Sequence, residues 1–240
     1  MKHKITKFNF PEGQIISDKF KIIRLIGSGW ESEVYIVEEL ATGIERAAKF
    51  FLPQRNKQNK VAKFYAKKLH KLRTCPVLIQ YHTQEKILFK DKEVTYLISE
   101  YVDGQPLGHW MKSQPGKRLA YFQALHLLHS LTKGIEDIHL LKEYHGDLHL
   151  DNVIVERFGL GFELKVLDMF HWGKATPEAL RDDLFDIIRL FYDVLGGSKH
   201  YKNQPKEIKE IICGLKRSLI SKKFKNVTKL RLHIENLQWK

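Results

Sequence analysis

The chain has 240 residues, which is enough for one large domain or two small lobes. Hydrophobic residues make up 43% of it and charged residues 29%, so the composition excludes a disordered chain and predicts a buried core. It has no run of 18 apolar residues and no apolar stretch at the N-terminus, so we expect neither a transmembrane helix nor a cleaved secretory signal.

Charge and cysteine content indicate the redox compartment of the protein and the kinds of partner it could bind. Two cysteines, Cys75 and Cys213, are too few for a disulfide framework or a thiolate zinc site, so we expect a reducing, cytoplasmic compartment and no disulfide partner. Lys and Arg number 41 against 28 Asp and Glu, a net charge of +13. This excess fits either self-repulsion that keeps the protein monomeric or attraction to a polyanion, and net charge does not choose between them.

The first hundred residues have the pattern of a β-rich unit. Alternating, β-branched runs joined by Gly-containing turns predict strands, and a later stretch switches to helical spacing, with Tyr65 on its apolar stripe. The expected elements, in chain order, are strands at 21–27, 32–40 and 44–51, a helix over 55–73, and strands near 86–89 and 94–100 around the turn 91–93.

The character of the sequence changes after Gly104. The expected elements there are a helix over 119–141, a loop rich in His and Asp, a hairpin of 153–156 with 164–167 around the turn 158–161, and mainly helical structure from Glu178 onward. The prediction is therefore a single α+β domain with an N-lobe at about 1–100, a hinge at about 100–106 and a C-lobe at about 107–240. A cleft between the lobes is the expected ligand site.

Two short segments of the first half carry little weight when each is taken alone. The turn Gly27-Ser28-Gly29 has no Cβ at two positions, so its backbone amides can approach phosphate oxygens closely. Lys49 ends the run Ala47-Ala48-Lys49 in the third expected strand. By themselves, the first is more typical of an ordinary hairpin and the second of a surface charge.

The second half holds a denser set of polar groups. The run from His145 to Asn152 reads HGDLHLDN, directly after a long helix and before a hairpin. Asp147 and Asn152 suit a carboxylate that orients a nucleophilic hydroxyl and an amide oxygen that binds a divalent cation. Asp168 closes an apolar strand, which suits a hard-cation ligand facing a phosphate, although such an Asp is more often a turn former.

In this order and context the four segments resemble the protein-kinase-like superfamily, whose signature is a Gly-rich loop, a strand lysine, a catalytic loop and a metal-binding Asp. The resemblance covers roughly residues 20–195. It implies a bilobal protein-kinase-like fold, with a small antiparallel β N-lobe that contains one helix and a mainly helical, truncated C-lobe.

The resemblance implies ATP and Mg²⁺ as cofactors and gives each motif of the first half a role. Gly27 and Gly29 would cover the ATP phosphates, and Lys49 would hold the α- and β-phosphates. The other implied nucleotide contacts are an adenine sandwich of Ile26, Val34 and Ala47, the loop residue Ser28, a small gatekeeper at Ser99, and a hinge running from Glu100 to Val102.

The implied catalytic residues are Asp147, Lys49 and His149. Asp147 would orient the acceptor hydroxyl and take its proton, while Asn152 and Asp168 would bind Mg²⁺. Asp183 would lie at the start of the large helix of the C-lobe and accept hydrogen bonds from the backbone of the catalytic loop.

Two departures from the family pattern concern the nucleotide loop and the lysine. Ser32 stands in the place of the third glycine, which is a mild change. No Asp or Glu occurs between Glu45 and Glu85, so the helix after Lys49 has no glutamate to pair with that lysine. Either another carboxylate orients Lys49, with Asp168 as the first candidate, or the site is impaired.

Two further departures concern the catalytic and metal loops. His-Gly-Asp lacks the arginine that would clasp a phosphorylated activation loop, and His149 replaces a lysine, as in aminoglycoside phosphotransferases and lipopolysaccharide kinases. The metal loop reads Asp168-Met169-Phe170, and only 14 residues separate Asp168 from Asp183. Thr176-Pro177-Glu178 resembles the end of an activation segment but lies too near Asp183 for that role, so we expect activity without activation-loop phosphorylation.

The helix over 55–73 is strongly basic. Lysines recur at helical spacing beside its apolar stripe, namely Lys60, Lys63, Lys67 and Lys71. They are read as a solvated face, whose long stems cover apolar surface, or as the binding site of an anionic partner such as RNA or a lipid headgroup.

Three functions remain open from the sequence. The favoured one is an atypical bacterial Ser/Thr protein kinase that moves the γ-phosphate of ATP to a protein hydroxyl, which the intact set Lys49, Asp147, Asn152 and Asp168 supports. A kinase for a small molecule or a lipopolysaccharide sugar is the alternative that His149 favours. A pseudokinase scaffold is the alternative that the missing helix glutamate favours.

Overall fold

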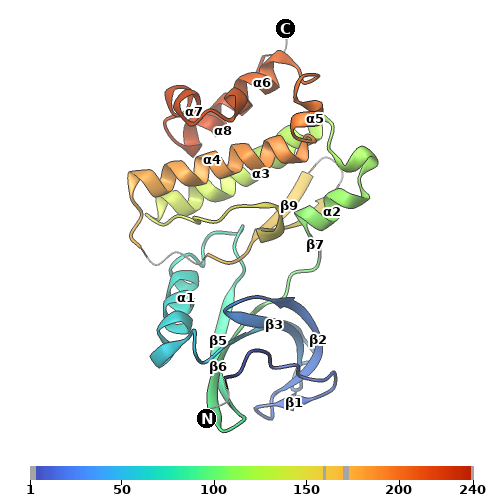
Figure 1. Cartoon of the computed structure of the whole chain (residues 1–240), viewed down its shortest axis with the longest axis vertical. Coiled ribbons are helices and arrows are strands. Elements are labelled where there is room, and N and C mark those ends of the chain that lie inside the picture. The colour runs from blue at the N-terminus through green and yellow to red at the C-terminus, as the bar shows by residue number, and fades with distance from the viewer. Residues whose placement is uncertain (1–3, 159–160, 170–172, 239–240) are drawn as a thin grey trace. The chain divides into compact units, whose positions relative to one another are not determined.

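The computed structural model describes residues 4–158, 161–169 and 173–238. It divides the chain into two compact units (Figure 1), unit 1 with Met1–Thr74 and Ile79–Val102, and unit 2 with Cys75–Leu78 and Asp103–Lys240. Unit 1 is built mainly of antiparallel strands and unit 2 mainly of helices, so the predicted α+β class is confirmed. That the two units make up one kinase-like domain stays a prediction.

The described part of unit 1 forms a six-stranded sheet in the order β1-β2-β3-β4-β6-β5, with every neighbouring pair antiparallel. Its strands are β1 (Ile15–Ile16), β2 (Phe20–Ser28), β3 (Ser32–Glu39), β4 (Glu45–Phe51), β5 (Tyr81–Phe89) and β6 (Lys92–Glu100). The predicted strands are all present, and β5 starts earlier than expected. The turn between β5 and β6 is Lys90-Asp91, both with positive φ, because that geometry matches the twist of a hairpin.

Helix α1 (Lys60–Lys71) is shorter than the predicted 55–73. Gln58 and Asn59 have left-handed backbone conformations, with φ of 55° and 57°, so the helix cannot extend back through the short 3₁₀ turn Lys57–Asn59. The Asn56 side chain accepts a hydrogen bond from the Ala62 backbone N–H at 3.2 Å, which supports the first turn of the helix. Figure 1 shows α1 alongside β5.

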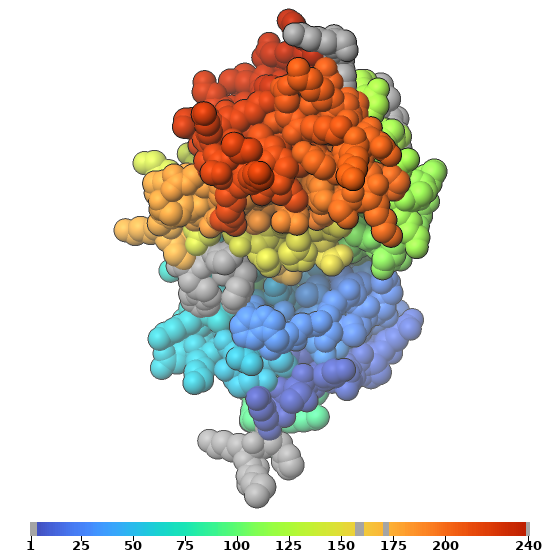
Figure 2. All heavy atoms as spheres, turned by 45° about the horizontal axis from the view of Figure 1, so that its top comes forward, coloured from blue at the N-terminus to red at the C-terminus, as the bar shows by residue number. Residues whose placement is uncertain are grey.

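The N-terminal strap, residues 4–14, completes the core on one face of the sheet. In Figure 2 these residues, in dark blue, lie over the outside of unit 1. Phe8 stacks on Phe10 with ring centroids 5.5 Å apart, and the buried Glu33 carboxylate accepts bonds from the Phe8 N–H and the Tyr35 hydroxyl. Burial, together with that bond to Glu33, raises the pKa of Tyr35. The sequence pattern did not predict this strap.

Removing the Phe8 ring should therefore destabilise unit 1. Phe8 is 4% exposed and meets the rings of Phe10, Phe50 and Phe89, so Phe8→Ala should lower the free energy of unfolding by about 3–5 kcal/mol. Urea unfolding measures this change. The half-exposed Phe122 supplies the control, because Phe122→Ala should change stability by less than about 1 kcal/mol. Equal losses in the two variants would contradict a structural role for the strap.

Unit 2 begins with the segment Cys75–Leu78 and continues from Asp103. Its elements are β7 (Gln105–Pro106), α2 (Leu107–Ser113), α3 (Tyr121–Leu140), β8 (Val153–Phe158), β9 (Gly161–Val166), α4 (Pro177–Val194), α5 (Ser198–Tyr201), α6 (Lys206–Ile212), α7 (Arg217–Lys223) and α8 (Val227–Glu235). The predicted long helix, the hairpin and the helical remainder are confirmed. Residues 159–160 of the predicted turn 158–161, and Phe170 of the predicted metal loop, lie outside the described residues.

The segment Cys75–Leu78 is built into unit 2. The Val77 carbonyl accepts a hydrogen bond from the Val166 N–H at 2.6 Å, which attaches the segment to the end of β9. A Cβ at Gly134 on α3 would come within 2.6 Å of a Val77 methyl group. The helix therefore carries glycine there because the Val77 side chain packs directly against its backbone.

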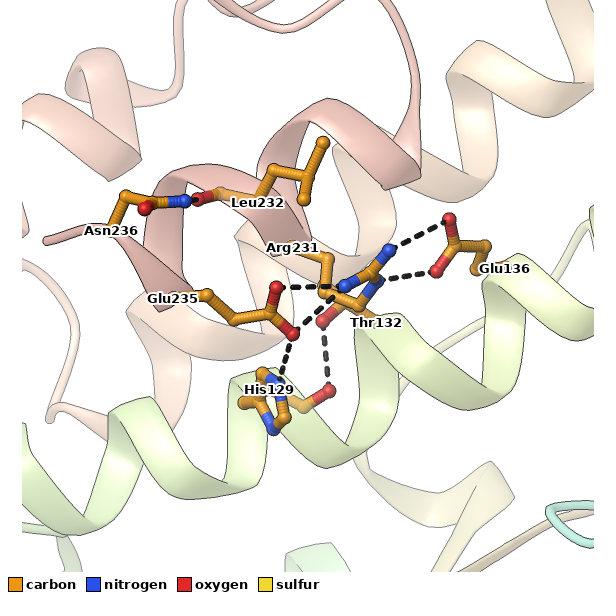
Figure 3. A network of polar contacts seen from close by, with 7 residues as sticks. All are labelled: His129, Thr132, Glu136, Arg231, Leu232, Glu235 and Asn236. Atoms are coloured by element: carbon orange, nitrogen blue, oxygen red, sulfur yellow. Dashed lines mark hydrogen bonds and ion pairs between the residues drawn. The ribbon is translucent and has the colours of Figure 1, made fainter.

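Helices α3 and α4 lie side by side, and α8 packs across α3 (Figure 1). Figure 3 shows Arg231 of α8 between Glu136 of α3 and Glu235 of its own helix, with His129 of α3 also bonded to Glu235. The hydrogen bond from Arg231 holds the pKa of Glu136 below its usual range. This network attaches α8 to α3, the helix that leads into the His- and Asp-rich loop.

Candidate active site

Strand register brings five nucleotide-binding candidates of unit 1 onto one face of the sheet, whereas Ser28 pairs with Glu33 and Glu100 with Arg46 on the other. Gly27 pairs with Val34, Val34 with Lys49, and Lys49 with Leu97. Ala47 pairs with Ser99 two residues further along. Directly opposed residues of antiparallel strands share a face, so these side chains lie on the face opposite the N-terminal strap.

The glycine-rich turn joins β2 to β3. The Gly29 N–H donates to the Ser32 carbonyl at 2.9 Å, which closes the turn, and Ile26 and Ser28 are exposed beside it. Trp30 stands at the tip with 64% of its surface exposed, and the Arg55 guanidinium lies 4.7 Å from its ring centroid. The large aromatic side chain at this tip was not singled out from the sequence.

The predicted gatekeeper and hinge residues follow one another at the end of β6. Ser99 is buried, and its hydroxyl donates to the Ala47 carbonyl at 3.5 Å. The Glu100 carboxylate accepts from the Gln80 N–H at 3.0 Å, and Val102 is half-buried beyond the strand. The role of this stretch in reading adenine stays a prediction.

The amine of Lys49 lies against aromatic rings of unit 1. It is 4.7 Å from the centroid of the Tyr65 ring and 5.9 Å from that of Phe51. Both distances are within the range of a cation–π interaction. Asp168, the first candidate to orient Lys49, belongs to unit 2, so that pairing stays a prediction.

The exposed side of α1 carries the four predicted lysines, Lys60, Lys63, Lys67 and Lys71. Lys68, by contrast, is buried. This arrangement agrees with a solvated basic face, while an anionic partner for it stays a prediction.

In unit 2 the imidazole of His145 connects the catalytic-loop candidate to the end of β9. Its Nε2–H donates to the Leu167 carbonyl at 2.7 Å, and its Nδ1 accepts from the Asp147 N–H at 3.2 Å. These two partners fix a neutral tautomer, because a carbonyl can only accept and an amide N–H can only donate. The loop before Asp147 is thereby attached to the residue before Asp168.

A buried carboxylate supports the same loop from the opposite side. Asp183 is 0% exposed, and it accepts hydrogen bonds from the His145 N–H at 2.8 Å, the Gly146 N–H at 2.7 Å and His139 Nε2 at 2.8 Å. Gly146 has φ of 82°, a conformation that favours glycine. The predicted bonds from Asp183 to the loop backbone are confirmed, although α4 starts at Pro177, six residues before it.

Neutralising Asp183 should disrupt this loop. In Asp183→Asn the side-chain oxygen can still accept, but the new NH₂ group faces a second N–H donor, so a buried donor loses its partner. The expected cost is about 2–4 kcal/mol of unfolding free energy. The adjacent Asp182 is half-exposed and pairs with Arg217 at the surface, so Asp182→Asn should cost less than about 1 kcal/mol. Chemical denaturation compares the two variants, and similar losses would argue against the assigned role.

Asp147 and Asn152 are joined directly. The Asn152 amide Nδ2 donates to the Asp147 backbone carbonyl at 2.9 Å and contacts its Oδ2 at 3.4 Å. The Asp147 side chain is 60% exposed, and His149 Nε2 lies 3.7 Å from its Oδ2. The structure therefore brings together Asp147, Asn152 and His149, with one carboxylate open to a substrate.

The same geometry suits a magnesium ion. Because Nδ2 of Asn152 bonds to Asp147, its Oδ1 is the atom that can coordinate a cation. The Leu167 N–H donates to the Asn152 carbonyl at 2.8 Å, which attaches the residue before Asp168 to this loop. Within the described residues no group of three or more His, Cys, Asp or Glu could hold a metal, whereas Mg²⁺ commonly takes one or two protein oxygens plus substrate phosphates.

Asp168 has an unusual backbone. Its φ is 56°, in the left-handed region that non-glycine residues seldom adopt, and the next residue, Met169, is buried at 1% exposure. Asp tolerates this conformation better than bulky residues do, and such strained positions concentrate at functional sites.

Thr176 and Pro177 have a structural role. The Thr176 hydroxyl accepts from the Ala179 N–H at 3.1 Å and caps α4, and Pro177 occupies the first turn, where its missing N–H costs nothing. The stretch that resembles the end of an activation segment therefore forms the start of α4.

Asp186, one turn after Asp183 on α4, was not singled out from the sequence. Burial, followed by the neighbouring charges of Asp183 and Asp182, raises its pKa to about 6, and Asp147 contributes in the same direction. The acidic residues behind the catalytic loop therefore repel one another.

This pKa predicts how stability depends on pH. The folded state holds the Asp186 proton more tightly than the unfolded chain, whose pKa is about 3.9, so the free energy of unfolding falls as pH rises from about 4 to about 6. Asp186→Asn should stabilise the protein at pH 7.5 by on the order of 1–3 kcal/mol, and the gain should vanish near pH 4. Denaturation across this pH range, with the exposed Asp103→Asn as control, measures the difference. A gain independent of pH would refute the explanation.

Comparison with known proteins agrees with this geometry. A family model described as the protein kinase domain matches residues 20–185, well over half of the chain. Curated relatives include myotonin-protein kinase of Mus musculus, 29% identical over 173 residues, serine/threonine-protein kinase pkn2 of Myxococcus xanthus, 24% over 171, and serine/threonine-protein kinase PrkC of Bacillus subtilis, 23% over 166.

The chain therefore belongs to the protein kinase domain family, and the predicted superfamily is confirmed. These alignments cover 70%, 70% and 68% of the chain, but 26%, 20% and 24% of the respective relatives. The chain thus spans about a quarter of their length. Among the described residues, none of the helices is both long and apolar enough to cross a membrane.

Proposed function

We propose that the chain is an ATP-dependent kinase that transfers the γ-phosphate of ATP to a serine or threonine hydroxyl of a protein. The observation that carries the proposal is the joined pair Asp147 and Asn152, with an exposed carboxylate held in place by a buried hydrogen-bond network. The names of the relatives are those of Ser/Thr protein kinases, which supports the choice of acceptor.

In this proposal each residue positions charge or a proton. Asp147 Oδ1 or Oδ2 accepts the proton of the acceptor hydroxyl, and His149 hydrogen-bonds the transferred phosphate. Lys49 holds the α- and β-phosphates from unit 1. Asn152 and Asp168 would hold Mg²⁺, which supplies positive charge against the phosphate oxygens. Little covalent chemistry is required of the protein, because phosphoryl transfer depends mainly on position and electrostatics.

We further propose that the activity needs no phosphorylation of an activation loop. Gly146 replaces the arginine that would clasp a phosphorylated loop, and its N–H instead bonds to Asp183. Only ten residues separate the end of β9 at Val166 from the start of α4 at Pro177. Unmodified residues hold the catalytic loop, among them His145, Asp183 and Asn152.

Removal of the base tests this function. With γ-labelled ATP, Mg²⁺ and a general protein substrate, Asp147→Asn should reduce label transfer by about 10²- to 10³-fold, and Asp168→Asn should do the same. Asp151→Asn, an exposed carboxylate of the same loop, should retain activity within about threefold.

The outcomes separate the alternatives. Turnover that appears only with added sugars or aminoglycosides would favour a small-molecule or lipopolysaccharide-sugar kinase. No transfer to any acceptor, with no change of melting temperature on adding Mg-ATP, would leave a pseudokinase scaffold and would refute the proposal.

A further inference from the structure

The family's usual partner of the strand lysine is missing from the helix that covers it. Helix α1 contains no acidic residue, and none occurs anywhere between Glu45 and Glu85. The face of α1 that packs on the sheet instead presents Tyr65, which is 4% exposed. The Lys49 amine lies 4.7 Å from the centroid of that ring.

Aromatic faces accompany cations repeatedly around this site. Phe51, on the same face of β4 as Lys49, adds a second ring at 5.9 Å from the amine. On α1 the buried Lys68 lies 6.0 Å from the Phe64 ring, and the Arg55 guanidinium lies 4.7 Å from the Trp30 ring. Lys49, Lys68 and Arg55 thus lie against aromatic rings, where the negative ring face attracts positive charge.

We propose that Tyr65 is the positioning residue of Lys49, and that its ring face takes the place of the helix glutamate. This inference rests on the proposed function, in which Lys49 binds the ATP phosphates. A ring attracts the ammonium group through its quadrupole, strongest where water is excluded, and it adds no negative charge beside the phosphates. The ring thereby orients the Lys49 amine without reducing the electrostatic attraction between that amine and the nucleotide.

The attraction depends on the electrons of the ring, so fluorination tests it at nearly constant shape. Position 65 is replaced by phenylalanine and by its mono-, di- and trifluorinated forms. Tyr65→Phe should retain kcat/KM for ATP within about threefold, and the trifluorinated ring should lower it about tenfold relative to Phe, with intermediate steps between. Melting temperatures should stay equal along the series. Tyr65→Leu should lose at least as much as the trifluorinated form.

Two controls make the result specific. The same fluorinated series at Phe89, whose ring lies 5.2 Å from the Lys90 amine, should leave kcat/KM unchanged. In Lys49→Met protein, the ATP dissociation constant should no longer depend on fluorination at position 65. A flat series at position 65, with turnover that still requires Lys49, would overturn the role of Tyr65 and leave the proposed function standing. Full turnover in Lys49→Met would instead refute the proposed function.

Discussion

The buried carboxylate of Asp183 is the interaction on which the catalytic loop depends. An uncompensated charge inside a protein costs several kcal/mol, so it persists only where donors surround it, and here three N–H groups do so. One of these donors is His145, whose ring then bonds to the backbone on both sides of the site. A single negative charge therefore fixes the end of α3, the turn before Asp147 and, through His145, the end of β9.

The sheet of unit 1 has two roles, because one face packs in the core and the other carries candidate nucleotide-binding residues. Alternation along β3, β4 and β6 separates the two tasks. Tyr35 and Phe50 pack against the strap and Tyr96 stacks on Phe50, while the residues between them in each strand face the other way. Aromatic side chains serve on both faces. On one face their rings fill the core, and on the other they lie beside cations.

Local pattern was enough to predict most of the fold, since the strands alternate and α3 has a clear apolar face. The four motifs identified the candidate residues, and the family resemblance identified Asp183. The strap was missed because the alternation Phe8-Asn9-Phe10 spans only three residues before Pro11, and the burial of the two rings depends on distant strands. Tyr65 was read only as part of an apolar stripe, since its position beside Lys49 arises when α1 packs on the sheet. Asp186 gave no signal because its raised pKa comes first from burial, which arises only when α4 packs within unit 2.

The strap and α4 bear on how this protein can be dissected. The family match runs from residue 20 to residue 185, so a fragment cut at those limits would lack the strap and end within α4 (Pro177–Val194). Such a fragment would expose the phenylalanine and tyrosine rings that the strap buries on the sheet. It would also lack the second half of α4, the helix that carries Asp183. Exposed apolar patches of this kind favour aggregation. The boundaries of the family match are thus narrower than the boundaries of the residues that take part in the folded core.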